Sequence, residues 1–425
     1  MKISKTLFVV LFTLCLSSAR GEGIPPKAQA FSLGDLIEMA MQHNRSLQSA
    51  GHQVDAARAG IESARAYPNP EVESVRGSLR GRQQGGADGT SQALWVTQRI
   101  EYPWLRDARI NAASAGYDAV RAEYAQSQNE LVARLRYRFY ELLRQEAELL
   151  AAQEDEATIQ QIAHRIKLKV ETGESPRFES IKAETELLSA RKTVQSAELK
   201  LNQTRATLRQ LVGAALPPVF NVSGQLREVT PVPPLERLLE EIRTRNPELI
   251  RSRALTRQAE RLHEYERHQR WPTISIKGGQ DQTPDVRDQR VGIVLTIPLW
   301  DRRSGPVAEA AAKLSKARNE ESLLEFNLEQ NLVAAWQQWR IAAFQVQALQ
   351  TGIVAQAENA LRIAEAAYRH GERGILEYLD AQRVYRAARN DLISARFDQH
   401  VAAIEIDRMR SAFVSPSGIA QEFEP

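Results

Sequence analysis

Proline is absent from two long stretches of the chain, residues 104–175 and 307–415. Proline inside a helix removes a backbone hydrogen bond and clashes with the preceding turn, so its absence over such lengths favours long helices. Within each stretch we expect the helix to end and the chain to reverse at a glycine, Gly173 in the first and Gly371 in the second. At 1.5 Å per residue, the roughly 70 residues before each glycine would form a helix on the order of 100 Å long. Such helices predict an elongated protein rather than a set of compact domains.

The two stretches belong to an internal duplication, because the same landmarks recur in the same order in both halves of the chain. Each half has an aromatic residue followed by proline, a second proline motif beside a tryptophan, and the glycine turn. The landmarks are Tyr67-Pro68, Tyr102-Pro103-Trp104 and Gly173 in the first half, and Trp271-Pro272, Ile297-Pro298-Leu299-Trp300 and Gly371 in the second. We therefore divide the chain into repeats at 31–216 and 235–412, a proline-rich connector at 217–234 and a C-terminal tail at 413–425.

Each repeat contains two segments that are candidates for a β-hairpin. They lie at 71–80 and 92–101 in the first repeat and at 273–282 and 289–298 in the second. The second hairpin alternates cleanly between apolar and polar positions, as expected of strands with one face toward lipid and the other toward a polar lumen. Its apolar positions are Ile274, Ile276, Val291, Ile293, Leu295 and Ile297. The first hairpin alternates poorly, since Glu71 and Glu73 share a side with Val75.

Shorter helices are expected on both sides of each hairpin and turn, at 45–67 and 176–212 and at 246–270 and 375–412. In each repeat the two short helices together nearly match the length of the long helix, so stacked end to end they can flank it. The second long helix also carries apolar residues at alternating spacings of four and three, the coiled-coil pattern, until the register lapses at Gln356. These residues are Leu328, Leu332, Ala335, Trp339, Ala342, Val346, Leu349 and Ile353.

The N-terminus is typical of an export signal. Lys2 and Lys5 precede an apolar run at 7–16, and small residues follow it at 17–19. We place a signal peptide at 1–19, with cleavage as late as residue 30 also permitted. The only cysteine, Cys15, lies in this segment, so the rest of the chain can form no disulfide. No later apolar stretch approaches the roughly 20 residues of a spanning helix, so a membrane-embedded part would have to consist of strands.

Four strands are too few to close a membrane barrel, because single-chain barrels begin at about eight strands and an open edge is not tolerated in lipid. A homotrimer would supply twelve strands, with a ring of helices below them. Aromatic residues flank the hairpins, as in the girdles that mark a membrane–water interface. We expect contact with outer-membrane lipid at the aromatic positions and barrel–helix junctions at the neighbouring prolines. These are Tyr67, Tyr102, Trp104, Trp271 and Trp300, and Pro68, Pro103, Pro272 and Pro298.

With these elements in place, the chain resembles the TolC-like outer-membrane efflux factor family over its whole exported length. Three segments are most similar to the heavy-metal (cobalt-zinc-cadmium, CzcC-like) branch: 67–70, 98–109 and 379–383. The resemblance implies a mainly α protein with a small membrane β-barrel portion, a trimeric α-barrel/β-barrel duct in the bacterial outer membrane. It also implies a function as the channel of a tripartite efflux system. The implied partners are a periplasmic adaptor protein and an inner-membrane pump of the resistance-nodulation-division type, and the implied cargo is heavy-metal cations.

The same resemblance points to functional residues at the helical tips. Glu377 and Asp380 match acidic positions that form the periplasmic constriction of the closed duct in the family, and two rings of three carboxylates would favour cations. Acidic residues at a helix start also simply complement the helix dipole. Glu179, Tyr368 and Arg373 match the places of a latch between neighbouring hairpins, formed by a tyrosine hydroxyl bond and an arginine–carboxylate pair.

Composition excludes several other classes. The 56 Lys and Arg residues nearly balance the 53 Asp and Glu residues, which argues against nucleic-acid binding. No phosphate-binding glycine loop or nucleophile elbow occurs, and the seven histidines are scattered, so we expect no enzyme, no cofactor and no stable metal site. Three alternatives stay open: a duct for multidrug efflux or type I protein secretion, a periplasmic adaptor, and a soluble coiled-coil scaffold.

Overall fold

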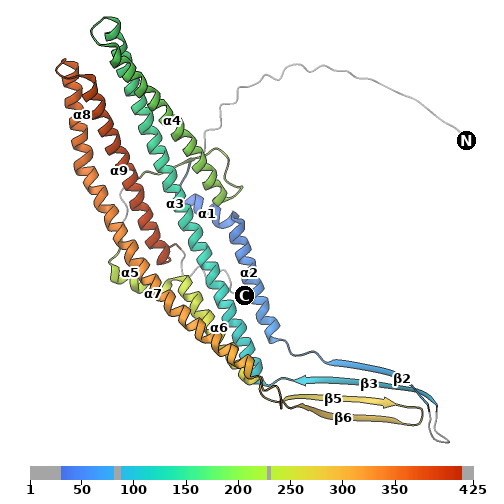
Figure 1. Cartoon of the computed structure of the whole chain (residues 1–425). Helices are drawn as coiled ribbons and strands as arrows, with labels where there is room; N and C mark the ends of the chain where they lie inside the picture. The colour runs from blue at the N-terminus through green and yellow to red at the C-terminus, as the bar shows by residue number, and fades with distance from the viewer. Residues whose placement is uncertain (1–29, 81–87, 227–230, 414–425) are drawn as a thin grey trace, which may run out of the picture.

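The computed structural model describes residues 30–80, 88–226 and 231–413. The expected signal peptide at 1–19 and the tail from 414 onward lie outside the described residues, and the later cleavage limit at residue 30 coincides with the first described residue. The protein is elongated: a four-stranded sheet forms one end, and two helical hairpins run away from it to separate tips (Figure 1). No helix among the described residues has both the length and the hydrophobicity needed to cross a membrane.

The sheet joins the two repeats. The strands β2 (Glu71–Leu79), β3 (Gly89–Ile100), β5 (Thr273–Gln282) and β6 (Arg287–Thr296) follow the order β2-β3-β5-β6, and all neighbours are antiparallel. The expected hairpins are therefore present, and β3 pairs with β5 across the repeats. The strands β2 and β6 form the two edges of the sheet. One chain thus leaves a free edge from each repeat.

The register also confirms the expected alternation in the second hairpin. Ile274 lies opposite Leu295 and Ile276 lies opposite Ile293, so the apolar side chains share one face. That face continues across the sheet through Val96 and Val72. The opposite face carries Glu71, Glu73 and Lys277. The acidic residues that disturbed the alternation of the first hairpin therefore belong to the polar face of the whole sheet.

In the first repeat, the helix α3 (Pro103–Glu171) runs unbroken for 69 residues. The helices α2 (Arg45–Arg65) and α4 (Arg177–Val212) both pack along it, as expected of two short helices beside one long one (Figure 1). In the second repeat, α6 (Pro247–His268) and α9 (Ile375–Met409) pack along α7 (Ser304–Ala348). Because α3 also contacts α6 and α9, the hairpins lie side by side in the order α4, α3, α9, α7.

The second long helix is not a continuous α-helix, which corrects the sequence-based expectation. After α7 comes a π-helical turn, η1 (Leu349–Ile353), followed by α8 (Val354–Arg369). Beyond this turn the buried Ala357 and the partly buried Leu361, Ala364 and Tyr368 resume the spacing of four and three, one residue later than the original register. A π turn accommodates one extra residue. The break in the apolar spacing at Gln356 therefore reflects one extra residue, a skipped residue of the coiled-coil register, which the π turn accommodates.

Equivalent asparagines anchor the two repeats near the middle of the molecule. The helices α1 (Leu33–His43) and α2 meet at Asn44, and α5 (Leu235–Arg245) and α6 meet at Asn246. Each asparagine caps the following helix by accepting a hydrogen bond, from Leu47 N and Leu249 N respectively, at 3.0 Å. Each also donates at 2.8 Å to a carbonyl at the end of the returning helix, Leu211 or Met409.

Three clusters of buried apolar side chains hold the helices together. The first packs α1, α3 and α4, and it includes Phe220 beside the short parallel pair of β1 (Ala30–Phe31) and β4 (Asn221–Val222). The second packs α5, α6, α7 and α9 around Leu332. The third lies near the tips and joins Ile162 and Ile166 of α3 to Ile375 and Tyr378 of α9. The two hairpins of one chain are therefore attached to each other close to their tips.

Candidate functional site

The four predicted junction prolines all stand where strands meet helices. Pro103 is the first residue of α3, where its missing N–H costs no hydrogen bond. Pro68 and Pro272 separate α2 and α6 from the strands that follow them, and Pro298 follows β6. Because proline cannot continue a helix or donate to a strand ladder, these residues define where the sheet gives way to the helices.

The aromatic residues at this boundary form one cluster and two separate sites. Tyr102 stacks on Trp104 at 4.7 Å between ring centres, and Trp104 meets Trp271 edge to face at 6.4 Å. The Tyr102 hydroxyl donates to the Pro272 carbonyl at 2.7 Å, which ties the first repeat to the second. Tyr67 lies apart, under the guanidinium of Arg106. Trp300 is 94% exposed.

Sequence reasoning missed an arginine clamp at the same boundary. Arg109 donates to the carbonyls of Ala64 and Ala66 at the end of α2 and lies 2.7 Å from Glu101, whose side chain is 5% exposed. Arg106 donates to the Arg65 carbonyl at 2.8 Å. Arginines bind the carbonyl groups that are left unpaired at a helix end. Both residues belong to the segment 98–109, so their spacing of three on one helical face was the available signal.

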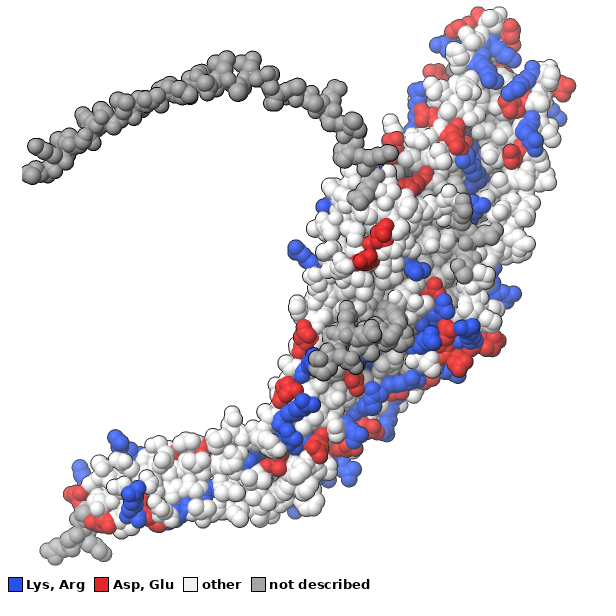
Figure 2. Space-filling view, turned by 180° about the vertical axis from the view of Figure 1, so that it is seen from behind, with Lys and Arg blue, Asp and Glu red and all other residues white. Residues whose placement is uncertain are grey.

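The polar face of the sheet carries a second group that sequence reasoning missed. Lys277 lies 3.2 Å from Glu73 and 5.0 Å from the ring centre of Trp95. The indole N–H of Trp95 donates to Asp281 at 3.2 Å. These contacts join β2, β3 and β5 through polar side chains. In Figure 2, charged side chains are dense over the helices and sparse over the middle of the sheet.

The predicted tip turns and gate residues lie at the far end of the hairpins. Gly173 and Gly371 both adopt a positive φ, at 80° and 75°, where glycine is favoured. Glu377 accepts a hydrogen bond from the Gly374 backbone at 3.1 Å and pairs with Arg373 at 3.4 Å. Asp380 pairs with Arg383 at 2.5 Å. Both carboxylates are more than half exposed, and each pairs with an arginine of its own chain. The two predicted rings need three chains and stay a prediction.

The three predicted latch residues are only partly brought together. Arg373 pairs with Glu377 on its own hairpin rather than with Glu179. The Tyr368 hydroxyl is buried and has no hydrogen-bond partner among the described residues. Burial raises the pKa of Tyr368, and the charge of Glu179 raises it further while Arg165 lowers it. Tyr368 also stacks on Tyr378, at 5.8 Å between ring centres. Tyr368 and Glu179 thus interact electrostatically without a bond.

No three His, Cys, Asp or Glu side chains of the described residues gather closely enough to hold a metal ion.

Long paired helical hairpins mounted on a small sheet, with one face apolar and one polar, define a channel protein of the outer membrane. The chain matches the profile of the outer membrane efflux protein family over residues 36–214 and 238–410, and it belongs to that family. These two matches cover both repeats. The chain is therefore an outer-membrane efflux protein.

Two relatives and one solved structure illustrate the similarity. The chain is 27% identical to the cobalt-zinc-cadmium resistance protein CzcC of Cupriavidus metallidurans over 388 residues, which is 90% of each chain. It is 24% identical to the nickel-cobalt-cadmium resistance protein NccC of Alcaligenes xylosoxydans xylosoxydans, over 73% of this chain and 69% of the relative. A crystal structure of the channel protein CusC has a TM-score of 0.76 at 20% identity, covering 89% of this chain and 91% of that chain. The expected fold class is confirmed.

Proposed function

We propose that three copies of the chain close into one duct through a repeated head-to-tail contact. The observation that carries this proposal is that the sheet and the helices leave unpartnered surfaces on the same two flanks. In the sheet these are β2 and β6, and in the helical part they are α4 and α7. A contact between the two different flanks generates a ring when the rotation closes. Three copies would supply twelve strands, enough for a membrane barrel.

The helical flanks carry matching apolar stripes. On α4 the stripe lies opposite the face that packs on α3, and on α7 and α8 it lies opposite the face that packs on α9, counting about 100° per residue. All of these side chains are at least half exposed in one chain. They are Phe178, Ile181, Leu188 and Leu199 on α4, and Leu323, Phe326, Ile341, Phe344 and Ile363 on α7 and α8. Exposed apolar patches of this kind mark protein–protein contacts.

We propose heavy-metal cations as the cargo, delivered by a periplasmic adaptor and an inner-membrane pump of the resistance-nodulation-division type. The resistance functions named for CzcC and NccC support this choice. The channel itself acts without catalysis. Disruption of the gene in its host should sensitise the cells to cobalt, zinc or cadmium salts. Sensitivity to organic drugs alone, or loss of a secreted polypeptide alone, would contradict the metal assignment.

We further propose that Glu377 and Asp380 line the periplasmic constriction and that Arg373 and Arg383 set how much of their charge reaches passing ions. In planar bilayers, E377Q/D380N should lower the preference of the channel for cations. The variant R373Q/R383Q should raise it, because the carboxylates lose their partners. Glu198, exposed on α4, supplies the control E198Q. Equal selectivity in all four proteins would remove these residues from the constriction.

We retain Glu179 and Tyr368 as latch residues, with their hydrogen bonds made only when neighbouring hairpins meet in the closed duct. The buried, unsatisfied Tyr368 hydroxyl supports this proposal, because a buried donor without a partner is costly. The variant Y368F should raise the conductance of the closed channel. A conductance equal to that of the parent would argue against the latch.

A further inference from the structure

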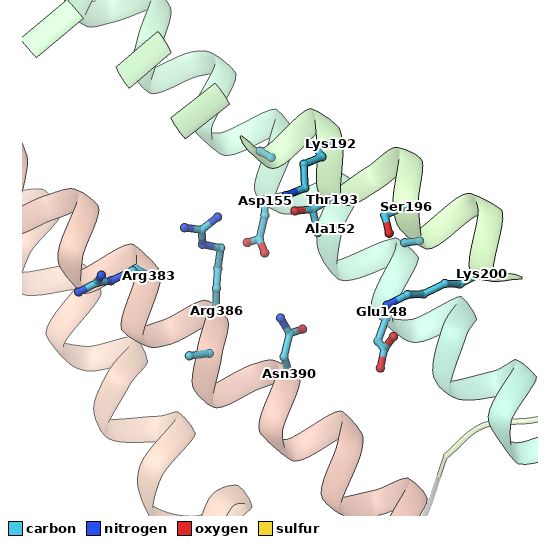
Figure 3. Close-up of a pocket in the computed structure, with 13 residues that line it drawn as sticks. Glu148, Ala152, Asp155, Lys192, Thr193, Ser196, Lys200, Arg383, Arg386 and Asn390 are labelled. Carbon is cyan, nitrogen blue, oxygen red and sulfur yellow. The ribbon is translucent and has the colours of Figure 1, made fainter. Parts of the chain in front are cut away.

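A cleft of about 480 Å³ opens between the two hairpins of one chain, well away from the tips and the sheet. Its floor is α3, and its walls are α4 and α9. In Figure 3, Lys192 and Lys200 extend from α4, while Arg386 and Asn390 rise from α9 toward them. Asp155 and Glu148 project from α3 between the walls. The cleft therefore collects charged side chains from three helices and both repeats.

The cations of the cleft are poorly compensated. No carboxylate oxygen of the described residues lies within 4.0 Å of the Lys192 or Lys200 ammonium. Arg386 has one weak ion pair, with Glu186 at 3.8 Å, and its Nε atom is buried without a hydrogen-bond acceptor. A buried guanidinium nitrogen without an acceptor costs free energy. The buried Arg386 Nε atom therefore lacks an acceptor, and the two exposed lysines carry positive charge that no nearby carboxylate offsets.

The carboxylates near the cleft do little to neutralise these cations. Glu148 pairs with Arg144 at 3.4 Å, on its own helix. Glu154 and Glu156, which neighbour Asp155 on α3, are held by Arg389 and Arg191. Asp155 itself lies more than 4.0 Å from every arginine nitrogen in the described part of the chain.

The protonation state of Asp155 sets how much negative charge remains in the cleft. Desolvation by burial raises the pKa of Asp155 to about 6, against the opposing effect of Arg386 and Arg389. Below that pH the side chain is neutral and can donate a hydrogen bond. Glu148 is then the one charged carboxylate among the residues that line the cleft, beside Lys192, Lys200 and Arg386. Arg383, which also lines it, is paired with Asp380.

We propose that this cleft binds a polyvalent oxyanion, of the chemical class of polyphosphates, polysulfonates and polycarboxylates. The two lysines are eight residues apart on α4, about 12 Å along the helix axis, so one small ion cannot contact both backbone positions. An anion with several charged oxygens can reach the lysines from one side and the Arg386 guanidinium from the other, where bidentate contact is favoured. The site lies between two hairpins, so an occupant would join them.

The test uses the detergent-solubilised full chain and naphthalene trisulfonate, a probe whose charge does not change near neutral pH. Binding is measured by isothermal titration calorimetry at constant ionic strength. The parent protein should bind the probe, and K192Q/K200Q should bind it at least about tenfold more weakly, as expected from the loss of two charge-assisted contacts. The control K167Q/K182Q removes the same number of lysines from α3 and α4 outside the cleft, and it should bind as the parent does.

The pH dependence of probe binding supplies a second readout. Affinity of the parent should rise severalfold between about pH 7.5 and about pH 5, and D155N should bind equally at both values because its side chain cannot titrate. Equal binding by the parent and K192Q/K200Q, or an absence of binding, would overturn the proposal. Binding does not require a channel, so this outcome is independent of the conductance and metal-efflux experiments.

Discussion

The guanidinium of Arg389 lies 2.5 Å from the carboxylate of Glu154, although the two residues are 235 positions apart in the chain. Arg389 belongs to α9 and Glu154 to α3, so this ion pair joins the two repeats. Along α3 and α9 it lies level with the cleft. Opening of the periplasmic end by separation of the hairpins would have to break it.

Because both side chains are partly exposed, we expect their coupling to be small. A double-mutant cycle with E154Q, R389Q and the double variant should give a coupling free energy of about 0.5 to 1 kcal/mol in thermal unfolding. The pair Arg261 and Glu264, which lies within α6, is a matched control that should leave the conductance of the channel unchanged. A coupling of zero, together with parental conductance in both variants, would show that the pair does not hold the hairpins together.

Deletion of Gly352 should be tolerated. The deletion removes one residue from the π turn, so α7 and α8 can join as one α-helix while Ala357 and Leu361 keep facing α9. Deletion of Ala360, an exposed residue of α8, is the control. It rotates Leu361, Ala364 and Tyr368 by about 100° and should destabilise the protein by more than about 2 kcal/mol. Circular dichroism melting curves compare the two, and equal losses would contradict the skipped-residue interpretation.

The capping asparagines should have unequal effects when replaced. Asn246 is 5% exposed, and its side chain makes both hydrogen bonds in a buried site. We expect N246A to lower the free energy of unfolding by about 1 to 3 kcal/mol, because it removes a cap and leaves the Met409 carbonyl without its donor. The equivalent N44A lies in a more exposed site and should cost less. Chemical unfolding measures both, and a larger loss in N44A would be the contrary result.

Stability should depend on pH through Asp155. Burial raises its folded-state pKa from 3.8 to about 6, so between these values the folded chain holds a proton that the unfolded chain releases. The free energy of unfolding therefore falls as the pH rises through this window, and above the window the contribution of Asp155 stays at this lower value. The variant D155N should melt about 2 to 4 °C higher than the parent near pH 7.5 if about 1 kcal/mol is recovered, and equally near pH 3.5. A lower melting temperature in D155N at neutral pH would contradict this assignment.

Much of the architecture could be predicted from local signals. Proline-free runs predicted the long helices, Gly173 and Gly371 predicted the turns, and alternation predicted the second hairpin. These features depend on residues close together in sequence. In the sequence, the π turn was visible only as a break in the apolar spacing at Gln356. Several kinds of helix distortion can accommodate one extra residue, so the sequence did not identify a π turn.

The candidate sites were less predictable, since they depend on which side chain reaches which partner. The predicted latch of Glu179 and Arg373 joins neighbouring hairpins and stays a prediction; within one chain Arg373 pairs with Glu377, one helical turn away. The cleft needs α4 and α9 on either side of α3, and no spacing in the sequence predicts that arrangement. The arginine clamp at the end of α2 is similarly a contact between residues about 40 positions apart.

Cross-linking between copies tests the closed ring most directly. Ile181 on α4 and Ile363 on α8 are both more than half exposed in one chain and lie at similar distances from the tips. In outer membranes, I181C/I363C treated with a short bismaleimide should yield a covalent trimer, while each single variant stays monomeric on denaturing gels. A double variant that stays monomeric, or that forms an open ladder beyond three copies, would contradict the trimeric duct.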